Sequence, residues 1–309
     1  MSGPTRGTAG GRAYLDLQNR ARREQRLTQE LLILYVLERW LARLAISPYA
    51  TSFILKGGLL LAALDARRST ADADLLAQHL AADERAMATC VREIAQMRLG
   101  EDDGVDFLPE TLRTQSIRDE ALYAGVRLTM DCHVATAEVT LKLDINVGDP
   151  VTPAPQPIHL PSQRPGYPAI AVLGYPIETV LAEKACTAIA LGEANTRVRD
   201  YVDLYTLTGG HPLPFHGMRA ALVATAHYRQ ITLVPLSQVV GALGSIRQAT
   251  YAAFRTRLGV DGAALPRDFS DVVAAVLPFV DPLVSEQKDD LRWMPATRVW
   301  SENSRSSVS

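Results

Sequence analysis

Two carboxylates separated by a single residue are the side chains in this sequence best suited to chemistry. Thr70, Asp72 and Asp74 alternate with alanines, so on a β-strand they share one face, with the carboxylates roughly 6 to 7 Å apart at Cβ. Oxygen ligands of this kind suit Mg²⁺ or Mn²⁺, which take one or two carboxylates, waters and substrate phosphates. Asp-x-Asp pairs are also common in solvated loops, so a third ligand is needed to make the pattern specific.

The segment 139–147 supplies that candidate third ligand. Its apolar and polar residues alternate with period two, which predicts a β-strand with Asp144 on the polar side. If a neighbouring strand brings Asp144 against Asp72 and Asp74, the three carboxylates form the two-metal arrangement of phosphoryl and nucleotidyl transfer. The alternative is a solvent-exposed aspartate on a half-buried sheet.

A lysine and two glycines precede the short apolar run 59–64, which is predicted to be a buried helix. At Lys56-Gly57-Gly58, backbone N–H groups could approach a phosphate closely, and the helix dipole would favour its charge. The chain contains neither GxxxxGK[ST] nor GxGxxG, so this is not a common nucleotide-binding loop. The alternative is a turn that starts a helix beside an exposed lysine.

Lys184 falls on the otherwise apolar stripe of a helix predicted over 176–191. Burying its ammonium group is costly unless an anion meets it, although a lysine at the edge of the stripe could also reach solvent. Asp200 and Asp203 are spaced i, i+3 on the next predicted helix, so either could orient Lys184 or hold an attacking hydroxyl. Their alternative role is ordinary pairing with neighbouring arginines.

The order of these elements predicts an α+β chain. Strand signals at 70–76, 126–130 and 139–147 lie in the first half, together with a helix over 81–99, whereas helices are predicted over 176–191, 198–207, 218–227, 236–254 and 269–280. The domain boundaries that we predict are an N-terminal helical arm at 1–50, a core at 51–150, a proline-rich surface crossing at 151–170, a helical domain at 171–285 and a flexible tail at 286–309.

Composition excludes several classes of protein. The 32 lysines and arginines against 34 acidic residues give a net charge of −2, so a nucleic acid would have to bind a local basic patch. Three distant cysteines without a CxxC pair disfavour a disulfide scaffold or a common zinc site and favour a reducing compartment. No apolar run is long enough to span a membrane and no signal peptide is apparent, so we expect a cytoplasmic protein.

Five motifs in this order resemble the AbiEii family of nucleotidyltransferase-like toxins, including the MenT group, over roughly residues 30 to 210. They are Ile46-Ser47-Pro48-Tyr49 with the Phe53-to-Gly58 segment, Arg68-to-Leu75, Leu141-to-Asp144, Leu181-to-Lys184 and Arg199-to-Leu204. The resemblance implies a polymerase β-like nucleotidyltransferase core, a small mixed sheet with helices, followed by a mostly helical domain. It also implies the toxin of a toxin–antitoxin pair, and members of the family resemble enzymes that transfer a nucleotide to the 3′ end of tRNA and so block translation.

Carried over residue by residue, the resemblance implies roles for most of the candidates. Asp72 and Asp74 match the metal-binding carboxylates, Thr70 a hydroxyl position beside them, and Lys56, Gly57 and Gly58 the nucleotide-side loop. Lys184 matches the later lysine, and Asp200 or Asp203 the closing acid. The sequence departs from the family where Leu59-Leu60 follows the glycines and where Gly57-Gly58 replaces the Gly-Ser of the wider superfamily.

The expected reaction is therefore Mg²⁺- or Mn²⁺-dependent transfer of a nucleoside monophosphate from an NTP to RNA, with a cognate antitoxin as a further partner. A small molecule or protein side chain could instead be the acceptor, or the fold could serve as a non-catalytic RNA- or partner-binding module. The densest basic segment carries Arg12, Arg20, Arg22, Arg23 and Arg26, with Arg219, His227 and Arg229 as the next candidates. A solvated helix face paired with acidic neighbours is the alternative for the first group.

Overall fold

The computed structural model describes residues 3–64, 66, 70–80, 83–118, 124–285 and 290–302. The chain forms two compact units, of which the first comprises Met1–Ala63, Ser69–Gly148 and Gln156–Gly174. The second comprises Leu64–Arg68, Asp149–Pro155 and Tyr175–Ser309. We describe each unit by itself.

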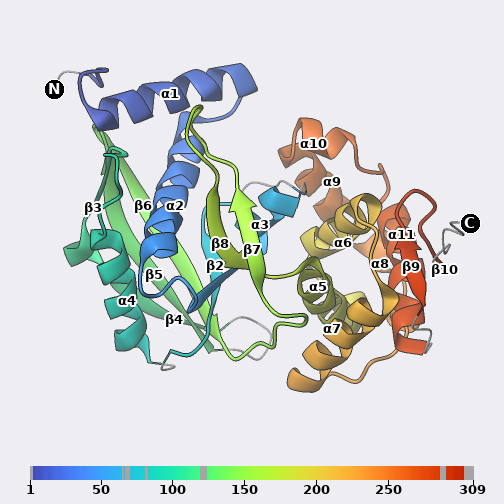
Figure 1. The fold of residues 1–309 in the computed structure, drawn as a ribbon. Helices are drawn as coiled ribbons and strands as arrows, with labels where there is room; N and C mark the ends of the chain where they lie inside the picture. Colours follow the sequence, from blue (N-terminus) through green and yellow to red (C-terminus); the bar gives the residue numbers. More distant parts are fainter. Residues whose placement is uncertain are drawn as a thin grey trace, which may run out of the picture. The chain divides into compact units, whose positions relative to one another are not determined.

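A mixed sheet of eight strands forms the centre of the first unit (Figure 1). Its strands are β1 (Phe53–Lys56), β2 (Ala73–Ala77), β3 (Val105–Phe107), β4 (Arg113–Arg118), β5 (Ala124–Val134), β6 (Ala137–Val147), β7 (Gln156–Leu160) and β8 (Ile170–Gly174). Their order is β3-β5-β6-β2-β1-β8-β7, and β4 also pairs with β5. The β1–β8 and β2–β6 pairs are parallel and the others antiparallel. The mixed sheet of the predicted α+β fold is thus confirmed.

The helices of the first unit are α1 (Ala9–Glu24), α2 (Thr28–Ile46), α3 (Gly57–Leu61) and α4 (Glu84–Gln96), with the 3₁₀ turns η1 (Ala62–Leu64), whose last residue is assigned to the second unit, and η2 (Pro109–Thr111). The central helix α2 lies along the sheet (Figure 1) and is buried almost all round from Leu31 to Leu44, including its charged residues Glu38, Arg39 and Arg43. We predicted a separate arm at 1–50, but the structure packs this helix into the core. The arm is therefore part of the first unit.

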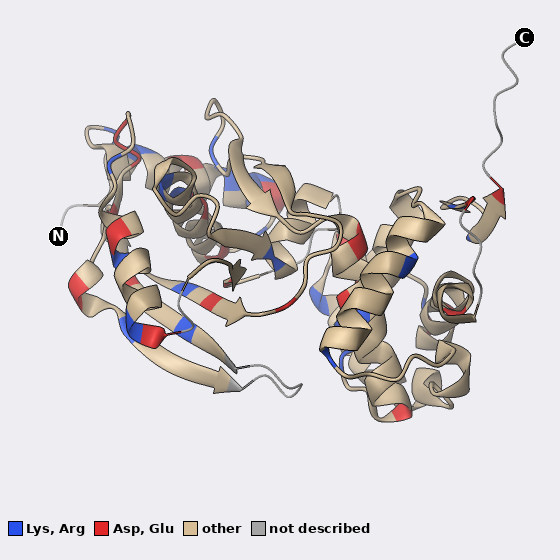
Figure 2. Cartoon of the chain, turned by 60° about the horizontal axis from the view of Figure 1, so that its bottom comes forward, with Lys and Arg blue, Asp and Glu red and all other residues tan. Residues whose placement is uncertain are grey.

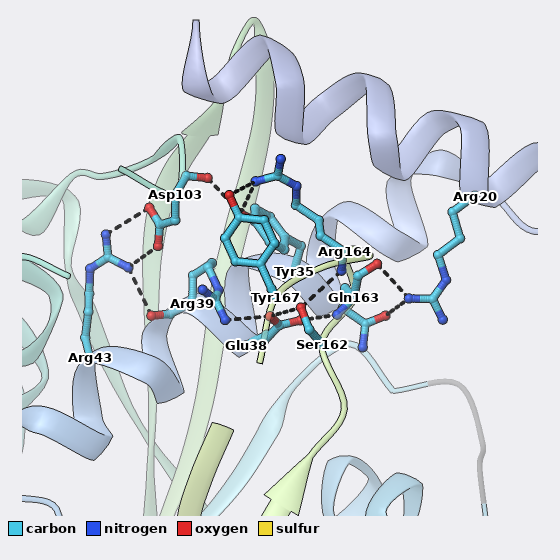
Figure 3. Close-up of polar contacts among 10 residues, drawn as sticks. All are labelled: Arg20, Tyr35, Glu38, Arg39, Arg43, Asp103, Ser162, Gln163, Arg164 and Tyr167. Atoms are coloured by element: carbon cyan, nitrogen blue, oxygen red, sulfur yellow. Dashed lines mark hydrogen bonds and ion pairs between the residues drawn. The ribbon is translucent and has the colours of Figure 1, made fainter. Parts of the chain in front are cut away.

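The proline-rich segment is more ordered than the surface crossing that we predicted. It contains β7, and the loop after β7 is attached to α2 through Glu38 (Figure 3). The Glu38 carboxylate accepts hydrogen bonds from Ser162 Oγ at 2.9 Å, from the Gln163 backbone N–H and from Arg39 at 2.6 Å. Burial raises the pKa of Glu38, whereas these donors favour its ionised form.

A second set of buried contacts attaches α2 to the turn before β3. Arg43 donates to both carboxylate oxygens of Asp103, at 2.6 and 3.2 Å, and the hydroxyl of Tyr35 donates to the Asp103 carbonyl at 2.7 Å (Figure 3). Arg164 joins this set through the Tyr35 hydroxyl at 3.3 Å. These bonds satisfy polar groups that would otherwise be costly to bury, so they set the position of α2 against the sheet.

The second unit is mostly helical. It contains α5 (Ile177–Leu191), η3 (Gly192–Ala194), α6 (Val198–Gly210), α7 (Phe215–Tyr228), η4 (Leu236–Gln238), α8 (Leu243–Ile246), α9 (Gln248–Arg257), α10 (Val260–Ala263), α11 (Phe269–Ser285), β9 (Leu291–Met294) and β10 (Val299–Glu302). The single helix that we predicted over 236–254 is wrong, since η4, α8 and α9 replace it. Gly241 interrupts it with φ +44°, and a Cβ there would lie 2.4 Å from Glu193 Oε1.

A β-hairpin occupies part of the tail that we predicted to be flexible. Strands β9 and β10 pair Trp293 with Trp300, and both rings pack on Phe279, with centroids 5.0 and 5.3 Å away. The prediction is therefore wrong for residues 290–302, because this aromatic cluster anchors the hairpin. The remaining tail residues, 286–289 and 303–309, lie outside the described residues.

Two exclusions made from the composition concern cysteines and membranes. Cys90, Cys132 and Cys186 are all buried free thiols, which agrees with the absence of a disulfide scaffold. In the part of the chain that the structure describes, no helix combines the length and apolar character that crossing a membrane requires.

Candidate functional site

Charged residues occupy one register position on four neighbouring strands of the first unit. Lys56 on β1 pairs with Asp74 on β2, Asp74 pairs with Asp144 on β6, and Asp144 pairs with Arg127 on β5. Register partners project to the same face of a sheet from strands about 4.8 Å apart. The pairing therefore brings Asp144 next to Asp74, as the sequence led us to expect. We call Lys56, Asp74, Asp144 and Arg127 the charged row.

Asp72 stands just before the charged row, at a bend that precedes β2. The strand begins at Ala73 rather than at Thr70, where we predicted its start. The Thr70 hydroxyl donates to Asp72 Oδ1 at 2.9 Å and to the Asp72 carbonyl at 3.1 Å. Thr70 thus orients the first carboxylate, which is half-buried.

Gly57 is required by the position of Asp74. Its φ is +66°, a left-handed conformation that favours glycine, and a Cβ built there would lie 1.7 Å from Asp74 Oδ2. The helix that follows is a single turn, α3, continued by η1, so the helix predicted over 59–64 is divided into two short elements. Gly57 therefore makes room for the Asp74 carboxylate. Phosphate binding by this loop stays a prediction.

Lys56 ends β1 and is only 8% exposed. The alternative of an exposed lysine beside a helix start is therefore wrong. A buried ammonium group requires nearby anions, and the register places Asp74 beside Lys56. Lys56 accordingly belongs to the charged row as one of its two cations.

Arg127 is the member of the charged row that sequence reasoning missed. Its Nε lies 2.8 Å from Asp144 Oδ1 and its Nη2 lies 2.6 Å from Oδ2, a two-point ion pair of the strong type. This pairing raises the pKa of Arg127 well above its ordinary value, and the charges of Asp72 and Asp74 add to the effect. The period-two pattern around 126–130 could have indicated Arg127 as a polar-face residue, but not its partner.

The predicted three-carboxylate metal site is not assembled in this structure. Among the described residues, no three His, Cys, Asp or Glu side chains are grouped so that they could hold a metal ion. The physical reason is that both oxygens of Asp144 face Arg127. The Asp74 carboxylate fills the space beside Gly57. Asp72 and Asp74 are oxygen donors of the kind that suits Mg²⁺ or Mn²⁺ completed by water and phosphate.

A second cluster of charges lies within the second unit. Lys184 Nζ is 2.9 Å from Asp200 Oδ1 and 2.7 Å from Asp203 Oδ2, and Arg197 Nε is 2.6 Å from Asp200 Oδ2. Burial would raise the pKa of Asp200, but Lys184 and Arg197 together outweigh it and lower the pKa to about 2. Asp200 and Asp203 therefore converge on Lys184 as we expected, and the alternative pairing of Asp200 with an arginine is present as well.

The basic residues proposed for RNA binding are only partly available. Arg20 pairs with Glu24 within α1, and Arg26, which follows α1, pairs with Glu30 of α2, each at 2.7 Å, as the solvated-face alternative predicts. Arg229 is not a surface residue, because its side chain is 10% exposed and pairs with Asp149 and Glu183. Figure 2 shows basic and acidic residues interspersed over the elements of both units. The candidates that remain are the exposed Arg12, Arg22 and Arg23 of α1, together with half-buried Arg219 and exposed His227 of α7.

The sequence and the fold of this chain are similar to those of known proteins. The family model described as the nucleotidyl transferase AbiEii toxin, type IV TA system, matches residues 39–283. The crystal structure of a candidate nucleotidyltransferase from H. pylori is similar over 84% of this chain and 99% of its own, with 14% identity and a TM-score of 0.47. JHP933 from Helicobacter pylori covers 76% of this chain and 97% of its own, with 16% identity and a TM-score of 0.40. No curated protein matches the sequence significantly.

Proposed function

Since the chain belongs to the AbiEii family of nucleotidyltransferase toxins of type IV toxin–antitoxin systems, we propose that it transfers a nucleoside monophosphate from an NTP to RNA. The proposed acceptor is the 3′ end of tRNA in the cytoplasm, and pyrophosphate is the second product. Capping this end would prevent aminoacylation and so inhibit translation. The family also implies an antitoxin partner.

The observation that supports this proposal best is the charged row beside Gly57. It unites a buried lysine and two aspartates on one face, next to a glycine whose Cβ would overlap Asp74. Nucleotidyl transfer needs positioning and charge stabilisation more than a nucleophilic side chain. Acidic and lysine residues without a serine or cysteine nucleophile are therefore the set that this reaction would use.

In the proposed reaction, Asp72 and Asp74 hold Mg²⁺ or Mn²⁺, with Thr70 keeping Asp72 oriented. The bound ion supplies charge neutralisation of the phosphates. Lys56 and the loop at Gly57 and Gly58 face the nucleotide phosphates. The RNA hydroxyl oxygen forms a bond to the α-phosphorus, the bond to the bridging oxygen of the β-phosphate breaks, and the hydroxyl proton passes to a neighbouring carboxylate or to water.

For Lys184, we propose the role of the later lysine of the family, which its sequence motif implies, with Asp200 or Asp203 as the acid that orients it. Both acids contact the ammonium group in the structure, at 2.9 and 2.7 Å. Because two carboxylates of α6 contact the ammonium group, its position is restricted, which suits binding of a phosphate in a fixed place. Lys184, Asp200 and Asp203 are proposed as one functional group.

The test is a transfer assay with each of the four α-labelled NTPs and either total tRNA or total cell protein as acceptor. We expect label on tRNA that depends on Mg²⁺ or Mn²⁺. The Asp72→Ala and Asp74→Ala variants should lose on the order of 10²-fold or more in rate. Asp106→Ala is the matched control, because Asp106 is an exposed aspartate of β3 in the same unit.

Full activity of Asp72→Ala would refute the metal assignment. Label on protein but not on tRNA would show that the acceptor is a protein rather than tRNA. Toxicity that persists in both aspartate variants without any transfer would favour a non-catalytic binding module.

A further inference from the structure

Arg127 has no role in the proposed reaction, although it contacts a carboxylate of the charged row. Its guanidinium occupies both oxygens of Asp144 at 2.8 and 2.6 Å, and it lies at one end of the charged row, opposite Lys56. Asp144 is the carboxylate that a two-metal site would need as its third ligand. In the structure, the Arg127 guanidinium contacts both oxygens of Asp144, where a metal ion would otherwise bind.

The surroundings of Arg127 are strongly acidic. Besides Asp144, the carboxylates of Asp72 and Asp74 act on the guanidinium. Carboxylates near one another repel, and a positive charge beside them offsets that repulsion. Arg127 supplies that charge at any physiological pH, because a guanidinium does not lose its proton.

The two partners differ in their freedom to move. The side chain of Asp144 is 12% exposed and that of Arg127 is 40% exposed. Strand β6 is paired on both sides by β2 and β5, so the aspartate has little room to leave. The long arginine can turn toward solvent at small cost, since its polar head would be hydrated there. An exchange of partners would therefore move Arg127 and leave Asp144 in place.

We propose that Arg127 is a positioning residue. It keeps the Asp144 carboxylate in place when no metal ion is bound, and it is displaced when a divalent cation binds this carboxylate. This inference rests on the proposed function, because it assigns a regulatory step to the same site. The guanidinium and the divalent cation compete for one carboxylate. Removal of Arg127 should consequently strengthen divalent-cation binding, which loss of a purely structural ion pair would not do.

The sheet offers a matched control in a second arginine–aspartate pair. Arg113 on β4 contacts both oxygens of Asp131 on β5 at 3.1 Å, and the two side chains are 66% and 41% exposed. This pair joins neighbouring strands of the same sheet but does not belong to the charged row. Its loss should leave cation binding unchanged.

The experiment measures binding of Mn²⁺ alone to the full chain, by the electron paramagnetic resonance signal of the free ion. We expect Arg127→Gln to bind Mn²⁺ roughly fivefold more tightly than the wild type, which corresponds to the upper range of a solvent-accessible ion pair. Arg113→Gln should retain the wild-type affinity. Asp144→Asn should bind more weakly than the wild type, and adding Arg127→Gln to it should cause no gain.

Wild-type or weaker affinity in Arg127→Gln would overturn the inference, and so would an equal gain in Arg113→Gln. If Arg127→Gln does not fold without metal, Arg127→Lys replaces it. Lysine keeps the charge but loses the two-point geometry, so at least a twofold gain in Mn²⁺ affinity is expected, and wild-type affinity would overturn the inference.

The two proposals fail in distinguishable ways. The proposed function fails if the wild type transfers no nucleotide from any NTP to RNA. The inference about Arg127 fails if the Mn²⁺ affinities of wild type and variants do not differ as stated, and this measurement involves no nucleotide, RNA or turnover.

Discussion

Replacement of Lys184 by alanine tests how the charge cluster of the second unit is balanced. The lysine is the contact that Asp200 and Asp203 share, at 2.9 and 2.7 Å. The side chains of these acids are only 3% and 5% exposed. Without the lysine, Asp200 retains Arg197 at 2.6 Å, but the cluster has lost one positive charge. The variant therefore buries negative charge that is no longer fully compensated.

The magnitude follows from the degree of burial. Removing one partner of a buried ion pair costs about 3–5 kcal/mol, because the remaining charge stays desolvated. For a unit of this size, such a loss lowers the melting temperature by on the order of 10 °C. We expect Lys184→Ala to lose activity together with stability, so activity must be compared at a temperature where both proteins are folded.

The pH dependence of stability provides a second readout. The pKa of Asp200 is about 2 in the folded chain against an ordinary value of 3.8. Because the folded value is the lower one, Asp200 contributes stability above about pH 4, and this contribution, about 2 kcal/mol, disappears as the pH falls through 2. In Lys184→Ala the lowering influence of the lysine is lost while burial still raises the pKa. Acid unfolding should consequently begin at a higher pH.

Thermal and urea unfolding at pH 7 and pH 4, followed by circular dichroism, measure these effects. Lys142→Ala is the control, since Lys142 is an exposed lysine on β6 and should unfold like the wild type. The triple variant Lys184→Met/Asp200→Asn/Asp203→Asn should recover part of the loss, because it removes the buried charges together. A melting temperature of Lys184→Ala equal to that of the wild type would refute the reasoning.

Three further predictions concern other parts of the chain. Gly57→Ala should displace Asp74 from its position, since the new Cβ would lie 1.7 Å from Oδ2; nucleotide transfer should fall on the order of 10²-fold, whereas Gly100→Ala, with open space around it, should behave like the wild type. Trp293→Ala should cost about 3–5 kcal/mol in urea unfolding because this ring is fully buried, and unchanged stability would show that the hairpin is not part of the core. Replacing exposed Arg22 and Arg23 by glutamine should flatten the salt dependence of RNA binding by about 0.7 to 0.9 per lost phosphate contact; an unaltered slope would place the RNA elsewhere.

Local patterns predicted many of the elements that carry the candidate site. The alternation over 139–147 lies entirely within β6, because a strand with one apolar face must repeat with period two. Proline before and glycine after 177–191 bound α5, since proline suits a helix start and glycine a helix end. The helical pattern over 236–254 failed at Gly241, whose φ of +44° ends the regular helix.

The residue types at the candidate site are properties of the sequence, and so are the i, i+2 spacing of Asp72 and Asp74 and the i, i+3 spacing of Asp200 and Asp203. The i, i+3 spacing acts within one helix, α6, where geometry is set by the backbone repeat, whereas Asp72 lies at the bend before β2 and only Asp74 lies on the strand. From them alone, the chemistry of oxygen ligands and a lysine could be derived.

Only the tertiary structure decided which of these groups meet. The pairing of Arg127 with Asp144 depends on the register between two strands, and a shift by one residue would have turned each side chain to the opposite face. The space for Asp74 depends on Gly57, which lies on a neighbouring strand end. Strand register and close approach between distant segments are set by the packing of the whole sheet, so no local pattern contains them.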